Sequence, residues 1–214
     1  MKNRRLILAL VSSLLLACAP AFANSISYSA SFPSTTTSFS IPISLPQFNP
    51  SMGTLTSITF TFDGQTTGSA TVTNNSGATG SYQVSISSNL KLLDPTNNTL
   101  ISITPSFNQT LNIANGDSGT ATGTSPVDTG STTITSGFSP YVGLGDVSFT
   151  VSGEGIGGVS GPSPFTVDSI TKGEGTITIT YNTSSVVPEP ATLALFGSGL
   201  LALGLLYQRR REQS

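Results

Sequence analysis

The chain of 214 residues contains no histidine and no tryptophan, has a single cysteine, and carries charge on only 8% of its residues. Without histidine, and with cysteine confined to one position, most general-base and nucleophile schemes are excluded. Zinc and haem sites lose their usual nitrogen and sulfur ligands for the same reason. The composition therefore predicts a protein that is not an enzyme and that needs no metal or cofactor.

Charge is especially scarce away from the two ends of the chain. Between residues 24 and 187 the only cations are Lys91 and Lys172, and aspartate and glutamate outnumber them. A weakly acidic, nearly uncharged surface offers little attraction for phosphate groups. We therefore expect neither nucleic acid nor anionic lipid headgroups as partners.

The N-terminal residues have the three parts of a secretory signal peptide. Basic residues stand within the first five positions, a mostly apolar run covers residues 6–17, and Ala21 and Ala23 form an A-x-A cleavage site. We therefore predict a signal peptide over residues 1–23 and export of the remaining chain.

The single cysteine lies inside this signal peptide. Cys18 follows Leu15, Leu16 and Ala17, a run that loosely resembles the lipobox of bacterial lipoproteins. Leu16 is larger than the small residue usual at its position, and the A-x-A site lies just downstream, so we favour ordinary cleavage over lipidation. On that interpretation the mature domain has no cysteine and no disulfide.

A second apolar run, residues 191–207, lies near the C-terminus and carries no charge. Its length is at the short end of the range for a membrane-spanning helix. Arg209, Arg210 and Arg211 follow it, and a basic cluster of this kind stays on the cytoplasmic side of the membrane. The pattern predicts a transmembrane helix with the rest of the chain outside.

The segment before this run consists of Val187, Pro188, Glu189 and Pro190. The two prolines favour an extended backbone that does not join the following helix, so the strip is exposed beside the membrane and suits a processing enzyme. Motif, span and basic cluster in this order resemble the PEP-CTERM sorting signal. The resemblance implies that an exosortase cleaves near residues 188–190 and passes the mature protein to the cell surface. An ordinary anchor helix after a proline-rich linker is the alternative.

The middle of the chain is rich in serine, threonine, glycine and asparagine, which favours strands and turns over helices. Apolar and polar residues alternate with period two in short runs, and the helical period is missing. The runs are residues 26–32, 39–45, 57–62, 70–73, 82–86, 100–103, 111–113, 147–151 and 177–181. We predict an all-β fold, a single antiparallel two-layer β-sandwich of roughly ten strands, over residues 24–181. A linker over residues 182–187 leads to the sorting tail over residues 188–211.

Turn-forming pairs separate several of these runs. Residues 63–64, 157–158 and 172–173 read Asp-Gly, Gly-Gly and Lys-Gly, and each pair predicts a turn. Residues 117–137 contain few large apolar side chains, and their pattern leaves open whether they form a long loop or an edge hairpin.

Residues 45–58, with the sequence LPQFNPSMGTLTSI, resemble the opening of the choice-of-anchor E domain. The similarity continues over residues 68–74 and 175–181. This family is named for carrying one of several C-terminal anchors, which agrees with the sorting tail. The resemblance implies a location and brings no activity with it.

Two short motifs with catalytic associations occur in this domain. Residues 116–119 read Gly-Asp-Ser-Gly, like the nucleophile motif of chymotrypsin-like proteases, but the chain has no histidine to accept the serine proton. Residues 153–158 have the spacing G-x-G-x-x-G, but residues 159–162 read Val-Ser-Gly-Pro, which cannot open the helix that a dinucleotide needs. We interpret the first as a turn and the second as a loop.

Glu154, Asp168 and Glu174 are the closest approach to a cluster of acids. A glycosidase needs only two carboxylates, placed across a sugar, but solvated loop acids explain these three equally well. No aspartate ladder of the calcium-binding kind is present. We therefore assign no catalytic residue and no metal ligand.

These features predict an exported surface or matrix protein with a non-catalytic β-sandwich, acting in the cell envelope, a biofilm or exopolysaccharide. The alternative is a carbohydrate-binding module at the cell surface, with polysaccharide as its partner. Such modules stack sugar rings on exposed aromatic side chains. Tyr141, between Pro140 and Gly143, is the tyrosine that we expect on a loop and hence as the platform, whereas Tyr82 and Tyr181 alternate with core residues and are expected to pack.

Overall fold

The computed structural model describes residues 24–184, 197–200, 202 and 209. Ser25–Thr183 forms one compact unit, and the account of the fold concerns this unit. The predicted signal peptide, with Ala21, Ala23 and Cys18, lies outside the described residues.

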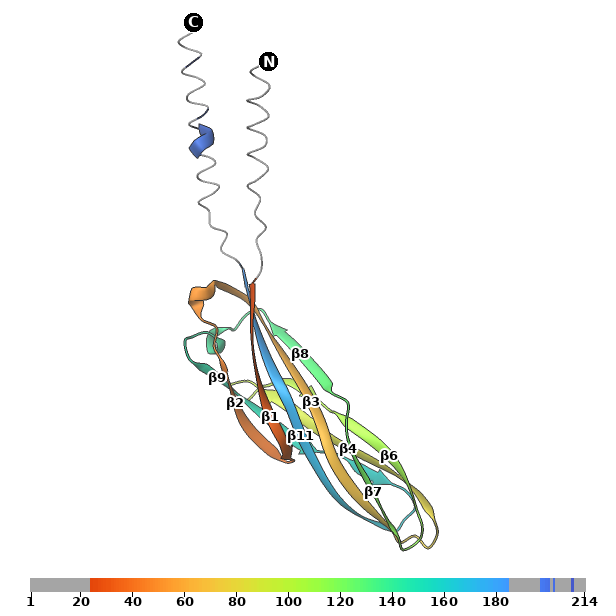
Figure 1. Cartoon of the computed structure of the whole chain (residues 1–214). Coiled ribbons are helices and arrows are strands. Elements are labelled where there is room, and N and C mark those ends of the chain that lie inside the picture. The colour runs from red at the N-terminus through yellow and green to blue at the C-terminus, as the bar shows by residue number, and fades with distance from the viewer. Residues whose placement is uncertain (1–23, 185–196, 201, 203–208, 210–214) are drawn as a thin grey trace, which may run out of the picture. The chain divides into compact units, whose positions relative to one another are not determined.

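The unit consists of two antiparallel sheets that form an open sandwich (Figure 1). One sheet has the order β1-β11-β3-β7, with β8 also paired to β3, and the other has the order β10-β4-β9-β2, with β5 and β6 also paired to β4. The predicted all-β sandwich architecture is confirmed, with eleven strands in the described residues.

The bounds of the strands follow the chain in order. They are β1 Asn24–Thr36, β2 Phe39–Pro46, β3 Thr54–Asn74, β4 Gly80–Leu93, β5 Thr99–Ile103, β6 Ser106–Ile113, β7 Ser118–Thr124, β8 Asp128–Ile134, β9 Asp146–Gly155, β10 Gly158–Ser160 and β11 Phe165–Ser184. Two short 3-10 turns, Pro50–Met52 and Ser139–Tyr141, complete the described secondary structure of the unit.

Two strands are much longer than the sequence predicts. β3 has 21 residues and β11 has 20, so the expected turns at residues 63–64 and 172–173 lie inside continuous strands. Gly64 faces inward, and a Cβ on it would come within 2.7 Å of the Ile103 side chain and 2.8 Å of the Leu90 side chain. A glycine is needed at this position because the opposite sheet approaches closely. The chain does not reverse there.

The ends of two other elements also differ from prediction. β10 begins at Gly158, within the turn expected at residues 157–158. β11 runs to Ser184 and so includes the first residues of the predicted linker. Asn182 is held there by two hydrogen bonds to β3: its carbonyl accepts from the Thr56 hydroxyl (2.9 Å) and its amide donates to the Ser57 hydroxyl (3.0 Å).

Residues 117–137 form neither a loop nor a hairpin. β7 pairs with residues 67–73 of β3, and β8 pairs with residues 58–64, so the two strands run end to end along the same edge. At the break between them, Ser125 N–H donates to the Thr66 carbonyl (2.8 Å), and the Ser125 hydroxyl accepts from Thr66 N–H (3.0 Å). This Gly-, Ser- and Thr-rich segment is thus one interrupted edge strand.

The interior has two apolar cores separated by a narrow waist. The larger contains residues such as Phe60, Phe149 and Ile179, and the smaller is built around Val72 and Tyr82. Between the two cores, the inward positions of β3 are occupied by two glycines and a threonine, namely Gly64, Thr66 and Gly68. The hydroxyls of Thr66 and Ser88, both buried, hydrogen-bond across the waist at 2.5 Å.

The high serine and threonine content is explained by the outer face of the five-stranded sheet. Cross-strand hydroxyl pairs join β1 to β11, with oxygen–oxygen distances of 2.8 Å for Ser27–Thr180, Ser29–Thr178 and Ser31–Thr176. Similar pairs join β3 to β7 and β8: Thr59–Thr133, Thr67–Thr124, Thr71–Thr120 and Thr73–Ser118. Paired hydroxyls of this kind are a recognised source of sheet stability.

Candidate functional site

Tyr141, the predicted sugar platform, lies in the larger core. Its side chain is only 4% exposed, its ring stacks on Phe149 with centroids 6.1 Å apart, and it lies 5.3 Å from the ring of Phe60. The Phe48 N–H donates to the Tyr141 carbonyl (2.8 Å), which fastens the 3-10 turn to the neighbouring loop. The prediction that Tyr141 is an exposed platform is therefore wrong, because a residue in a short connection can still point inward.

Tyr82 and Tyr181 pack in the interior, as their alternation predicts, and both are fully buried. The Tyr181 hydroxyl donates to the Pro46 carbonyl (2.9 Å), and the Tyr82 hydroxyl donates to the Pro162 carbonyl (3.1 Å). Burial raises the pKa of Tyr181 and of Tyr141 above the ordinary tyrosine value, and the charge of Asp94 adds to the effect on Tyr141. Every aromatic side chain among the described residues is buried or only partly exposed, which leaves no open stacking platform of the predicted kind.

The protease-like and dinucleotide-like motifs have structural roles in this fold. Gly116 has a positive φ of 83° in the turn before β7, and Ser118 pairs its hydroxyl with Thr73 (2.7 Å) on the outer face. The glycines at residues 153–158 end β9 and begin β10, so a strand stands where the motif requires a helix. Neither motif therefore has the surroundings that its chemistry requires.

The three candidate acids do not converge. Asp168 and Glu174 stand six residues apart on β11, which corresponds to about 20 Å along a strand. A glycosidase needs its two carboxylates within about 10 Å of each other. Glu154 lies on β9, in the other sheet. Within the described residues no three His, Cys, Asp or Glu side chains are grouped in a way that could hold a metal ion.

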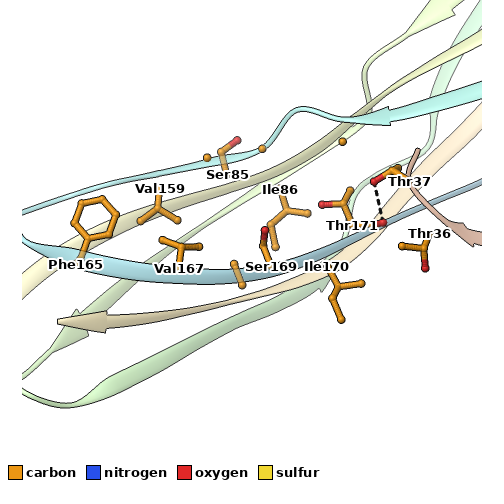
Figure 2. Close-up of a pocket in the computed structure, with 14 residues that line it drawn as sticks. Thr36, Thr37, Ser85, Ile86, Val159, Phe165, Val167, Ser169, Ile170 and Thr171 are labelled. Atoms are coloured by element: carbon orange, nitrogen blue, oxygen red, sulfur yellow. Dashed lines mark hydrogen bonds between the residues drawn. The ribbon is translucent and has the colours of Figure 1, made fainter. Parts of the chain in front are cut away.

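A cleft of about 400 Å³ opens between the two sheets, beside the smaller core (Figure 2). It is lined by Thr36, Thr37, Ala70, Ser85, Ile86, Gly155, Gly157, Gly158, Val159, Phe165, Val167, Ser169, Ile170 and Thr171. None of these residues is charged, and both apolar side chains and hydroxyls are present. Its volume is within the usual range for ligand pockets. No motif in the sequence indicates this cleft, because its lining residues come from strands far apart along the chain.

The predicted sorting residues lie almost entirely outside the described residues. This holds for Val187, Pro188, Glu189 and Pro190, for Arg210 and Arg211, and for most of residues 191–207. Arg209 is helical and exposed. Among the residues that the structure describes, no helix combines the length and the apolar character needed to cross a membrane.

Comparison with known families provides the clearest functional evidence. Residues 186–211 match the model of the PEP-CTERM protein-sorting motif. The match includes Pro188, Glu189 and Pro190, together with the apolar run and the three arginines. It supports an exported protein that is made as a membrane-anchored precursor and processed by exosortase to a surface form. The choice-of-anchor E resemblance finds no such support, and no curated protein matches the chain.

Similarity to solved structures is weak. A chain in the structure of infectious bursal disease virus, Gx strain, has 10% identity and a TM-score of 0.21, over 79% of this chain and 36% of that one. The VP2 subviral particle of infectious bursal disease virus gives 11% identity and a TM-score of 0.21, over 78% and 39%. The CBM2 module of the evolved Dit of Lactobacillus casei BL23 phage J-1 gives 14% identity and a TM-score of 0.23, over 68% and 70%. This protein thus spans little more than a third of the viral chains, and similarities of this size say nothing about function.

Proposed function

We propose that the mature protein is a non-catalytic β-sandwich, displayed on the cell surface or released from it, that serves as a structural component of the envelope, biofilm or exopolysaccharide matrix. The sorting motif over residues 186–211 is the observation that carries the proposal. A sorting signal of this kind delivers its passenger to the outside of the cell, where a matrix component acts.

The sandwich itself supports a structural role in two ways. Two of its candidate acids, Asp168 and Glu174, are too far apart on β11 for paired catalysis, the third, Glu154, lies in the other sheet, and the chain contains no histidine. Its outer face carries several cross-strand hydroxyl pairs, as on Ser29–Thr178 and Thr71–Thr120, and only a few charged side chains, among them Asp63, Asp168, Lys172 and Glu174. A hydroxyl-rich, weakly acidic face suits a hydrated matrix, since it has little attraction for anionic polymers.

Carbohydrate binding is the weaker alternative. Tyr141 cannot serve as its stacking platform, because that ring is buried against Phe60 and Phe149. The uncharged cleft is the remaining feature that a neutral saccharide could enter, and a binding assay with neutral oligosaccharides would test it.

The sorting step can be tested by changing the motif in the native host. We expect the variant Pro188→Ala, Glu189→Ala, Pro190→Ala to remain at full length in the membrane fraction, while the wild-type chain is shortened and appears at the surface. Glu174→Ala removes an acid outside the motif and should be processed like wild type. Processing of the triple variant at the wild-type rate would refute recognition of the motif.

The matrix role needs a separate test. A strain that lacks this protein should lose matrix cohesion or surface attachment, and expression of the wild-type chain, but not of the unprocessed triple variant, should restore it. An unchanged matrix in the deletion strain would reject the structural role while leaving the sorting result intact.

A further inference from the structure

The first part of β11 has an unpaired edge. β1 pairs with β11 and ends at Thr36. The next residue, Thr37, still contacts β11, since its N–H donates to the Thr171 carbonyl (3.0 Å). Residues 165–170 continue β11 beyond this point. Among the described residues, no other strand pairs with β11 on the side that β1 occupies.

The alternation of a strand defines what this edge offers. The Thr171 carbonyl points toward β1, so the N–H and C=O groups of Ser169 and Val167, two and four residues earlier, point to the same side. These backbone groups are spaced about 7 Å apart. They are a ready pattern of donors and acceptors for one more strand.

The inner face of the same segment is open as well. Gly173, Ile177, Ile179 and Tyr181 are inward-facing and buried, and the same alternation places Val167 inward. Val167 is nevertheless 43% exposed, because it faces the cleft instead of packed side chains. Figure 2 shows Val167 and Ser169 directed toward Val159 and Ile86, with Ile170 pointing the other way.

The opposite wall of the cleft contributes Ser85, Ile86 and Val159, and three glycines among them leave part of the space unfilled. Gly155, Gly157 and Gly158 contribute no side chains. Gly157 lies so close to β4 that a Cβ on it would be 3.1 Å from the Ile86 Cα. The cleft therefore combines an unpaired strand edge with an inner face that is only partly covered by side chains. Both features leave room for one additional strand beside β11.

We propose that this cleft binds an extended peptide segment of another protein by strand addition, in line with β1 and along residues 165–170 of β11. Recognition would come from the backbone groups of Val167 and Ser169, and side chains of the guest would enter the cleft at every second position. Since the lining is uncharged, those side chains would be uncharged, and since several of them share about 400 Å³, they would be small, such as alanine, valine or threonine.

The observations favour this partner over two others. A saccharide would meet one aromatic ring, that of Phe165, which packs edge-on against Tyr82 and is only partly exposed, and the regular backbone spacing matches a strand better than a sugar. A second copy pairing through the same edge would bring two Asp168 side chains close together, because this residue lies in the middle of residues 165–170. Like charges facing each other across strands are destabilising. The inference does not depend on the sorting step or on the matrix role.

The test uses the full-length chain in detergent micelles and a synthetic probe peptide of about eight residues, long enough to cover an edge of about 20 Å. Valine and threonine alternate in the probe between terminal lysines. We expect it to slow amide hydrogen exchange at Val167 and Ser169 by about tenfold or more, since a newly paired amide is protected. The same peptide with N-methyl groups on alternate amides cannot form the ladder and should give no protection.

Two variants locate the binding. Val167→Glu places a charge in the cleft and should abolish protection at Ser169, while Val127→Glu, at a position 55% exposed between β7 and β8, should leave it unchanged. Unfolding midpoints close to wild type would show that both variants fold. No protection by the probe would overturn the proposal, as would equal protection by the N-methylated peptide. Protection by cellopentaose without protection by the peptide would overturn it in favour of a saccharide site.

Discussion

Replacing Tyr141 by alanine should destabilise the sandwich strongly. The ring is 4% exposed and packs against Phe60 and Phe149 in the larger core. Removing a buried aromatic ring costs about 3–5 kcal/mol of unfolding free energy, because contacts are lost and a cavity is left behind. For a domain of this size each kcal/mol lowers the unfolding midpoint by about 2–4 °C. We therefore expect a fall of about 6–20 °C.

Two phenylalanine variants serve as matched controls. The Tyr141 hydroxyl has no hydrogen-bond partner among the described residues, so Tyr141→Phe should cost less than about 1 kcal/mol. Tyr181→Phe loses the hydrogen bond to the Pro46 carbonyl and should cost about 1 kcal/mol or more. The assay is thermal unfolding followed by near-ultraviolet circular dichroism, with urea unfolding as a check. If Tyr141→Ala unfolds within about 2 °C of wild type, the placement of this ring in the core is wrong.

Three further outcomes are expected. Thr66→Val leaves the buried Ser88 hydroxyl unpaired and should lower the free energy of unfolding in urea by about 1–3 kcal/mol. Adding Ser88→Ala removes the unpaired hydroxyl, so the double variant should lose less than twice that amount. Burial raises the pKa of Asp94, but hydrogen bonds from Thr96 and Asn98 outweigh it and lower the pKa overall. The ionised Asp94 therefore stabilises the fold above its unfolded pKa of about 3.9, and this is lost as pH falls through the lower folded value, so the difference in unfolding midpoint between wild type and Asp94→Asn should shrink in acid. Spectrophotometric titration should show Tyr181 ionising only at a pH above the ordinary tyrosine pKa, since burial raises its pKa, and a normal titration of every tyrosine would contradict its placement.

The sandwich could be predicted because its cores follow a simple alternation. Ile58, Phe60 and Phe62 share one face of β3, and Ile177, Ile179 and Tyr181 share one face of β11, and all six are fully buried. Period-two patterns of this kind report directly on which face of a strand is buried. The hydroxyls between them pair on the outer face, which agrees with the threonine-rich sequence.

The lengths of the strands could not be predicted because the glycines gave the wrong local signal. An Asp-Gly pair is typical of a turn, yet Gly64 stays in β3 because the side chains of Ile103 and Leu90 leave no room for a Cβ. Close approach between two sheets depends on residues far apart in the sequence. A local pattern contains no information about such an approach.

The candidate site was missed for a related reason. Residues 165–169 show an ordinary alternation, and nothing in them indicates that β1 ends at Thr36 and leaves their edge unpaired. For Tyr141 the sequence predicted a site that the structure does not have. Its neighbours Pro140 and Gly143 are typical of a surface connection, but the side chain of Tyr141 points into the core. Both outcomes depend on which elements lie next to each other in space.

The measurement that tests the central claim most directly is the intact mass of this protein from its native host, determined separately for membrane, surface and medium fractions. The account predicts a surface or medium species that begins at Asn24 and ends near residues 188–190, without the apolar run and the arginines. A chain that keeps its full C-terminus in every fraction would contradict it. The tail would then be a plain anchor, and the sandwich would have to act while still attached to the membrane.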